Sequence, residues 1–344
     1  MRRIDLNTAT DEQLLATRLC DLPLTADAPF IAKHIRRLHR ELARRGLRFK
    51  PHVWLADEWF SVDGVPGFAA PFDLAHPRLL RLQRRMMGEA EGGNSNWMMR
   101  ILRHEAAHAY DNAFRLRRRK SWRAHFGKAS TPYPTRYRPN ARSRDYVLHL
   151  GAWYAQSHPA EDFAETFAVI LQPRAAWRRT YADSPRVLAK LHYVRELCEE
   201  LRGRQPSIAS RALVEPLASN RRTLSEHYER AARRQALEQS RQYDRWLKQA
   251  FPSRSANARL VSAAQALRRE RDALVRRLSE ELRLHPYHVR NVLRAVIARC
   301  DALDLRATGD RRKSARKARS MMKRLLRAQF TVDSAHRSRQ QYAV

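Results

Sequence analysis

The stretch that decides the fold reads His104-Glu105-Ala106-Ala107-His108, an HExxH box. It lies within residues 97–119, where helical apolar spacing and the absence of proline predict one continuous helix. Residues four apart share one helical face, so both imidazoles can reach a single metal ion. Glu105 points beside that ion, where a carboxylate suits a base acting on metal-bound water. We therefore expect His104 and His108 to bind one Zn2+ ion and Glu105 to be catalytic.

A catalytic zinc takes three protein ligands, so a third must lie elsewhere in the chain. The extended HExxHxxGxxH pattern fails, because Asp111 and Phe114 stand where its glycine and third histidine would be. The best candidate is Glu161, in a helix predicted to begin near its proline and to span residues 159–173. His158 is a rival third ligand.

Further carboxylates are expected to orient the ligands. Glu165, one turn after Glu161, can accept the free N–H of a ligating histidine and fix its tautomer. Asp111, three residues after His108, is a rival for that task. The alternative explanation for these carboxylates is capping of a helix N-terminus by acidic residues.

Composition limits the class of protein. Apolar residues make up 43% of the 344 residues, which is enough for a core and suggests one large domain with an extension, or two domains. The three cysteines are widely spaced and form no CxxC pair, which argues against a disulfide framework and a cysteine zinc site. No apolar run suits a signal peptide or a membrane span, so we expect a cytoplasmic protein.

The net charge of +33 is the second unusual feature. Residues 203–344 hold 33 basic and 13 acidic residues, so the excess leans toward the carboxyl end. Such a field attracts nucleic acid or another polyanion, although arginine on solvated helix faces explains it equally well. Residues 121–147 combine basic and aromatic side chains, including Tyr133, and suit either a binding surface or an ordered loop.

The remaining patterns predict an α+β fold that is mainly helical. A capping box at Thr10 opens a short helix, and other helices are expected at about 30–42, 77–87, 187–201, 222–250, 256–283, 286–301 and 310–329. Short β-like runs within 49–75, with Asp63-Gly64 as a turn, predict a small antiparallel sheet. We expect a zincin-like catalytic domain over 1–202, a basic helical extension over 203–330 and a disordered tail over 331–344.

Several stretches together resemble the bacterial putative zinc-binding metallopeptidase family. They are the HExxH box, His158-Pro159-Ala160-Glu161-Asp162-Phe163-Ala164-Glu165-Thr166-Phe167, Asp63-Gly64-Val65-Pro66-Gly67 and Leu74-Ala75-His76-Pro77-Arg78. The resemblance covers roughly residues 20–250. The helix at Glu161 also resembles, more distantly, that of anthrax-lethal-factor-like peptidases in the gluzincin group. The resemblance implies zinc bound by His104, His108 and Glu161, with Glu105 as base. In the anthrax-lethal-factor-like peptidases a tyrosine precedes the glutamate ligand by seven residues, and Tyr154 stands at the matching position of this sequence.

This ligand set predicts a zinc-dependent peptidase that hydrolyses peptide bonds through a zinc-bound water activated by Glu105. Glu105 then returns the proton to the leaving amine. Tyr154, His149 or His158 can donate to the oxyanion, and Tyr154 is the first choice. The alternative is a nucleic-acid-binding protein with a vestigial or structural metal site. The expected partners are a protein or peptide substrate and a polyanion on the basic extension.

Overall fold

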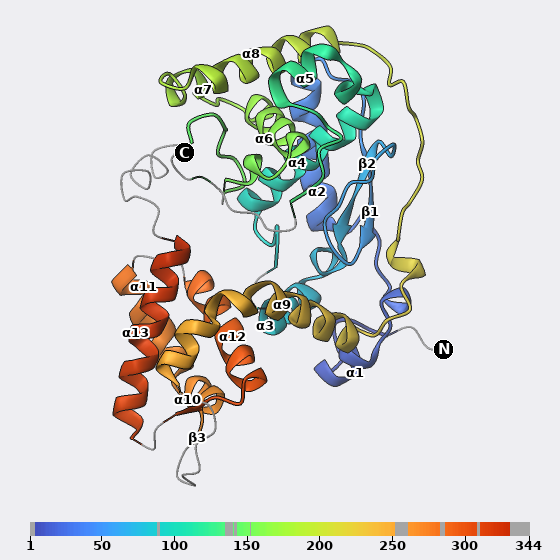
Figure 1. The fold of residues 1–344 in the computed structure, drawn as a ribbon. Helices are drawn as coiled ribbons and strands as arrows, with labels where there is room; N and C mark the ends of the chain where they lie inside the picture. The colour runs from blue at the N-terminus through green and yellow to red at the C-terminus, as the bar shows by residue number, and fades with distance from the viewer. Residues whose placement is uncertain are drawn as a thin grey trace. The chain divides into compact units, whose positions relative to one another are not determined.

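Figure 1 shows the chain in a computed structural model that describes residues 4–87, 90–134, 140, 143–151, 153–251, 261–282, 286–307 and 310–330. Two compact units make up the chain. The first contains residues 1–85 and 90–224, and the second contains residues 86–89 and 225–344. The predicted tail over 331–344 lies outside the described residues. None of the helices described here is long and apolar enough to cross a membrane.

The first unit consists of helices around a two-stranded sheet. Its elements are α1 (Asp11–Ala16), α2 (Pro29–Arg44), β1 (His52–Ala56), β2 (Gly67–Pro71), α3 (Pro77–Met87), α4 (Ser95–Phe114), α5 (Lys120–Phe126), α6 (Pro159–Leu171), α7 (Trp177–Thr180) and α8 (Pro185–Glu200). Thr10 and Gln13 form the predicted capping box at the start of α1. The mainly helical class predicted from the sequence is confirmed.

Helix α4 is the centre of the first unit, because it is buried along most of its length and packs on α2, α6 and β2. The side chain of Asn94 caps its start. The helix ends at Arg115, whose left-handed φ of 52° breaks the hydrogen-bond ladder. The single helix predicted over 97–119 is therefore too long: residues 116–118 form a 3-10 turn, and α5 begins at Lys120.

Helix α6 packs along α4, and two of its phenylalanines lie in the core of the first unit. Phe163 and Phe167 are fully buried, and the ring centroid of Phe167 lies 5.5 Å from that of Tyr110 on α4. Burying a phenylalanine side chain stabilises a fold by roughly 1.5 to 3 kcal/mol. This packing fixes α6 against the HExxH box of α4.

The two strands of the first unit run parallel, with His52 opposite Gly67. A Cβ atom at position 67 would lie 2.6 Å from the carbonyl oxygen of His52, so this close approach requires glycine. The antiparallel sheet predicted here is therefore wrong for its main pair. Within residues 49–75, all of which the structure describes, antiparallel pairing is limited to one bridge between Phe60 and Ala69, which lie on either side of the predicted Asp63-Gly64 turn.

The position of β1 depends on contacts that the turn does not determine. A turn aligns only the segments on either side of it. Trp54 and Ala56 of β1 instead belong to an apolar cluster with Val65 and Ala69. The indole N–H of Trp54 also donates to the carbonyl oxygen of Val214 at 2.9 Å, across 160 positions of the sequence. These contacts place β1 beside β2 in parallel.

The first unit continues past residue 202, the predicted end of the catalytic domain. The backbone N–H of Leu19 donates to the carbonyl oxygen of Arg222 at 2.8 Å. Residues 203–224 therefore cover the first unit instead of opening the extension, and the division between units follows Leu224.

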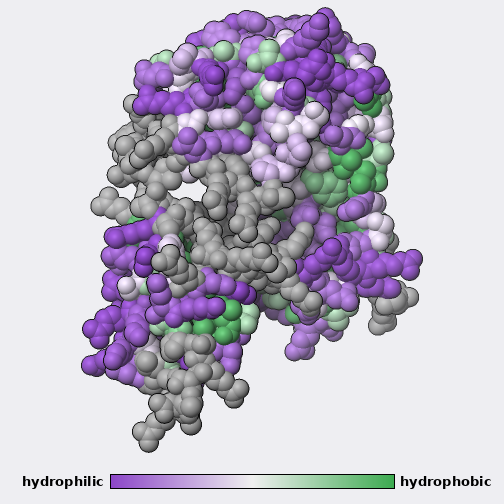
Figure 2. Space-filling model, viewed as in Figure 1, coloured by the Kyte–Doolittle hydropathy of each residue, from purple (hydrophilic) through white to green (hydrophobic). Residues whose placement is uncertain are grey.

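The second unit is a small helical bundle with a short antiparallel strand pair. Its elements are α9 (Leu224–Ala250), β3 (Val261–Ser262), α10 (Ala263–Arg269), α11 (Arg271–Leu282), α12 (Pro286–Ala302), β4 (Arg306–Ala307) and α13 (Arg311–Phe330). Leucine, valine and methionine side chains from α10 to α13 form its core. The helix predicted over 256–283 is divided at Glu270 into α10 and α11. Figure 2 shows hydrophilic side chains over much of the drawn face of this unit.

Candidate metal centre

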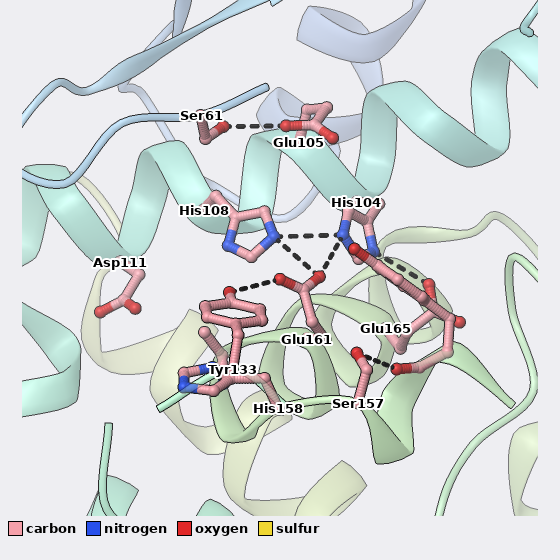
Figure 3. Close-up of polar contacts among 12 residues, drawn as sticks. Ser61, His104, Glu105, His108, Asp111, Tyr133, Ser157, His158, Glu161 and Glu165 are labelled. Carbon is pink, nitrogen blue, oxygen red and sulfur yellow. Dashed lines mark hydrogen bonds and ion pairs between the residues drawn. The ribbon is translucent and has the colours of Figure 1, made fainter. Parts of the chain in front are cut away.

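The HExxH box and helix α6 bring three metal-binding atoms together (Figure 3). Nε2 of His104 lies 3.0 Å from Oε2 of Glu161 and 3.1 Å from Nε2 of His108. Nε2 of His108 lies 3.3 Å from the same carboxylate oxygen. All three side chains are buried. The packing of α4 on α6 thus joins two predicted ligands of the box to the predicted third ligand.

The chemistry and spacing of these atoms fit zinc. Two imidazoles and one carboxylate form a ligand set of catalytic zinc sites, which leave a further position for water or substrate. Ligand atoms at about 2.0 to 2.1 Å from a tetrahedral zinc lie about 3.3 Å from one another. The three separations observed here, 3.0, 3.1 and 3.3 Å, are close to that value. Within the described part of the chain, this is the group of side chains that meets these requirements.

Glu165 holds the opposite nitrogen of His104. Its Oε1 lies 2.9 Å from Nδ1 of His104. Its Oε2 accepts hydrogen bonds from the backbone N–H groups of His149 and Leu150, at 3.2 and 2.8 Å. A carboxylate held by two amides is an acceptor, so in the neutral imidazole Nδ1 carries the proton and Nε2 presents its lone pair.

Burial and the neighbouring charged groups shift the pKa values of His104 and Glu161 in opposite directions. Burial opposes protonation of His104, but hydrogen bonds to Glu161 and Glu165 outweigh it and raise the pKa of His104 to about 10. Burial also opposes ionisation of Glu161, but the charge of His108 and the hydrogen bond to His104 lower the pKa of Glu161 overall. The carboxylates therefore stabilise positive charge between them, which a divalent cation can supply in place of a proton.

Glu105 lies apart from the three-atom cluster, and Ser61 holds its carboxylate (Figure 3). The hydroxyl of Ser61 donates to Oε2 of Glu105 at 2.8 Å. Asn112, on the same helix as Glu105, fixes the turn that carries Ser61: its amide donates to the carbonyl oxygen of Val62 and its oxygen accepts from the N–H of Gly64. Helix α4 therefore carries Glu105 and anchors the group that orients it.

Asp111 does not contact the free nitrogen of a histidine of the box, the role for which it was predicted as the rival of Glu165. Its carboxylate accepts hydrogen bonds from the backbone N–H and from Nε of Arg117, at 2.8 and 2.7 Å. The same guanidinium donates to Asp63 at 2.6 Å. Through Arg117, Asp111 therefore ties the end of α4 to the 63–64 turn, and Glu165 is the carboxylate that contacts an imidazole of the HExxH box.

Two other histidines considered from the sequence are engaged elsewhere. Nδ1 of His158 accepts from the backbone N–H of Ala160 at 3.1 Å, so Nε2 carries the proton and donates to the carbonyl oxygen of Thr131 at 2.7 Å. Nε2 of His149 donates to the carbonyl oxygen of Arg100 at 3.0 Å, and burial lowers the pKa of His149 to about 4. His158 has no lone pair left for a metal, and the donor nitrogens of both rings are already used.

Two tyrosines border the cluster. The ring centroid of Tyr154 lies 5.7 Å from that of His104, and 38% of the residue is exposed. Burial, together with the charges of Glu161 and Glu105, raises the pKa of Tyr154, so its hydroxyl stays protonated. The hydroxyl of Tyr133 donates to Oε1 of Glu161 at 2.7 Å.

The structure thus gathers most of the predicted site residues and adds two that sequence reasoning missed. His104, His108, Glu161 and Glu165 are in contact, while Glu105 and Tyr154 lie beside them. Ser61 and Tyr133 were missed, because their contacts span 44 and 28 positions and follow no motif. The only signal was that Tyr133 lies in the basic and aromatic segment between the two motif helices.

A comparison with known families supports the same region. Residues 82–197 match the model of a family described as "Putative zinc-binding metallo-peptidase". The match covers about a third of the chain and includes all of α4 and α6, with the three candidate ligands. No curated protein and no solved structure matches the chain. The resemblance inferred from the motifs is confirmed over these residues.

Proposed function

We propose that this protein is a zinc-dependent peptidase of the gluzincin type, in which His104, His108 and Glu161 hold one Zn2+ ion. The observation that carries the proposal is the convergence of two imidazole nitrogens and one carboxylate oxygen, each within 3.3 Å of the others, on two packed helices. These helices lie inside the segment that matches the family model.

When bound, zinc supplies a Lewis acid that lowers the pKa of water toward about 7 and polarises the substrate carbonyl. The groups of the chain itself move the protons. Glu105, oriented by Ser61, takes a proton from the attacking water and delivers it to the departing amine. The hydroxyl of Tyr154 donates to the oxyanion that develops on the attacked carbonyl. Glu165 retains the proton on Nδ1 of His104, so that Nε2 remains a ligand.

The test replaces Glu105 by glutamine, which preserves the shape of the side chain but removes the base. Cleavage of a proteome-derived peptide mixture is measured by mass spectrometry of the new termini. The rate of cleavage should fall by about 10² to 10⁴ while zinc content is unchanged. Glu199→Gln, at an exposed pair with Arg202, is the matched control and should cleave like the wild type. A Glu105→Gln protein that keeps both its zinc and its cleavage activity would contradict the mechanism.

A second candidate function, polyanion binding, rests on the surface of α13. Arg312, Lys313, Arg316 and Lys317 are exposed, and within the described part of the chain no acidic side chain pairs with them. By contrast, Arg319 and Lys323 on the same helix pair with Glu281. Cations spaced three and four residues apart share one helical face, which suits the regular phosphates of a nucleic acid.

The salt dependence of binding to a mixed-sequence DNA duplex tests this second function. Replacing the four exposed cations of α13 by alanine in the full chain should weaken binding and reduce the slope of log K against log salt by about 0.9 for each phosphate that is no longer neutralised. Alanine at Arg319 and Lys323 should have a smaller effect, because the Glu281 carboxylate already offsets part of their charge. Equal binding by all three proteins would reject α13 as the polyanion surface.

A further inference from the structure

The two oxygens of the Glu161 carboxylate have different partners. Oε2 faces the imidazole nitrogens of His104 and His108, at 3.0 and 3.3 Å. Oε1 accepts a hydrogen bond from the hydroxyl of Tyr133 at 2.7 Å (Figure 3). The phenol therefore engages the oxygen that does not face the imidazoles.

Tyr133 is itself held in place by His158. The two rings are stacked, with centroids 3.8 Å apart and planes 11° from parallel. Nε2 of His158 also donates to the carbonyl oxygen of Thr131, two residues before Tyr133. Because Nδ1 of His158 caps the first turn of α6, one histidine fixes both the helix that carries Glu161 and the segment that carries Tyr133.

Tyr133 remains partly exposed to solvent, although its ring stacks on His158 and its hydroxyl is committed to Glu161. The residue is 57% exposed, yet the hydrogen bond to Glu161 is partly buried. The stack on His158 positions the ring, and the hydroxyl makes the hydrogen bond to Glu161, which points to a role in controlling the carboxylate.

A carboxylate can bind a metal through one oxygen or through both. A hydrogen bond to one oxygen orients the ligand and reduces the availability of that oxygen to the metal. We propose that Tyr133 is a positioning residue that keeps Glu161 a single-oxygen ligand of the metal. This inference rests on the proposed function. Its consequence is that the site keeps room for both water and a substrate carbonyl.

The experiment replaces Tyr133 by phenylalanine, which keeps the ring that stacks on His158 and removes only the hydroxyl. The full-length protein is loaded with Co2+, whose d–d absorption distinguishes four from five ligands. In Tyr133→Phe, Oε1 is free to bind, so the molar absorption should fall by about twofold or more and shift to shorter wavelength. The zinc dissociation constant should rise by about tenfold, because a ligand that loses its outer hydrogen bond binds metal more weakly. Competition with a chromogenic chelator measures it.

Tyr193→Phe is the matched control. It also removes the hydroxyl of a tyrosine whose ring stacks on a histidine, but that ring stacks on His125 and its hydroxyl lies 3.4 Å from Oγ of Ser121. Its Co2+ spectrum should equal that of the wild type. A Tyr133→Phe spectrum identical to the wild-type spectrum would overturn the inference and leave the proposed function intact. Failure of the wild-type protein to bind either metal would instead overturn the proposed function, and the inference with it.

Discussion

Nδ1 of His104 lies 2.9 Å from Oε1 of Glu165, whose other oxygen accepts two backbone amides. Glu165→Gln should weaken zinc binding by about 10- to 100-fold. The amide group of glutamine must present N–H donors either to the imidazole or to the amides of His149 and Leu150, which are donors themselves. Chelator competition measures the effect, and Glu199→Gln is the exposed control. An unchanged zinc affinity would show that Glu165 does not orient His104.

The hydrogen bond from Ser61 to Glu105 predicts a separate effect on catalysis. Ser61→Ala should lower kcat/KM by about 10- to 100-fold, because a hydrogen bond to a charged group contributes roughly 1.5 to 3 kcal/mol. Zinc content should not change, since the described side-chain hydrogen bond of Ser61 goes to Glu105 and not to a proposed ligand. Steady-state cleavage of one identified peptide measures the effect, with exposed Ser207→Ala as control. Full activity in Ser61→Ala would mean that Glu105 needs no such support.

Stability in the first unit depends on a buried ion pair between α2 and α4. Nε and Nη2 of Arg103 donate to the two oxygens of Glu41 at 2.7 and 2.9 Å, and the side chains are only 5% and 2% exposed. Glu41→Leu leaves the guanidinium buried without its partner, so the free energy of unfolding should fall by about 3 to 5 kcal/mol.

Urea unfolding followed by tryptophan fluorescence measures this decrease in the first unit, because only Trp246 lies in the second. Glu199→Leu breaks an exposed pair and should cost less than about 1 kcal/mol. Equal decreases in the two variants would refute the special importance of the buried pair.

A pH dependence of stability should come from Asp73. Burial raises the pKa of Asp73 to about 7, from an ordinary value of 3.8. The folded state therefore holds a proton that the unfolded state releases. The contribution of this proton to the free energy of unfolding is fully present below about pH 4 and is lost as the pH rises through about 7. The decrease is about 1.4 kcal/mol per pH unit within that window.

Asp73→Asn removes the titrating group, so its unfolding free energy relative to the wild type should increase between pH 5 and pH 8. The same urea titrations measure the difference, with exposed Asp27→Asn as control. A difference that does not vary with pH would show that Asp73 is not protonated in the folded protein.

Local patterns predicted much of the fold. The helix expected at 77–87 is α3, and the capping box at Thr10 forms as expected. The end of α4 was missed because Arg115 adopts a left-handed conformation that its residue type does not favour. The parallel pairing of β1 was missed because it depends on contacts with distant residues such as Val214.

In the candidate site, too, local patterns predicted the residues but not their detailed contacts. His104 and His108 lie on one helical face because of their spacing alone, and Glu161 and Glu165 follow from a second helical pattern. Which carboxylate oxygen faces which nitrogen depends on the packing of α6 against α4 and on the segment that carries Tyr133. No periodicity encodes these contacts, so the partners of Glu105 and of Oε1 of Glu161 emerge only from the three-dimensional structure.

Metal analysis of the purified wild-type protein and of Glu161→Ala tests the central claim most directly. The proposed site predicts one zinc per wild-type chain, with the zinc lost from Glu161→Ala while the protein remains folded by circular dichroism. A folded Glu161→Ala protein that retains one zinc per chain would contradict the assignment of His104, His108 and Glu161 as the ligand set.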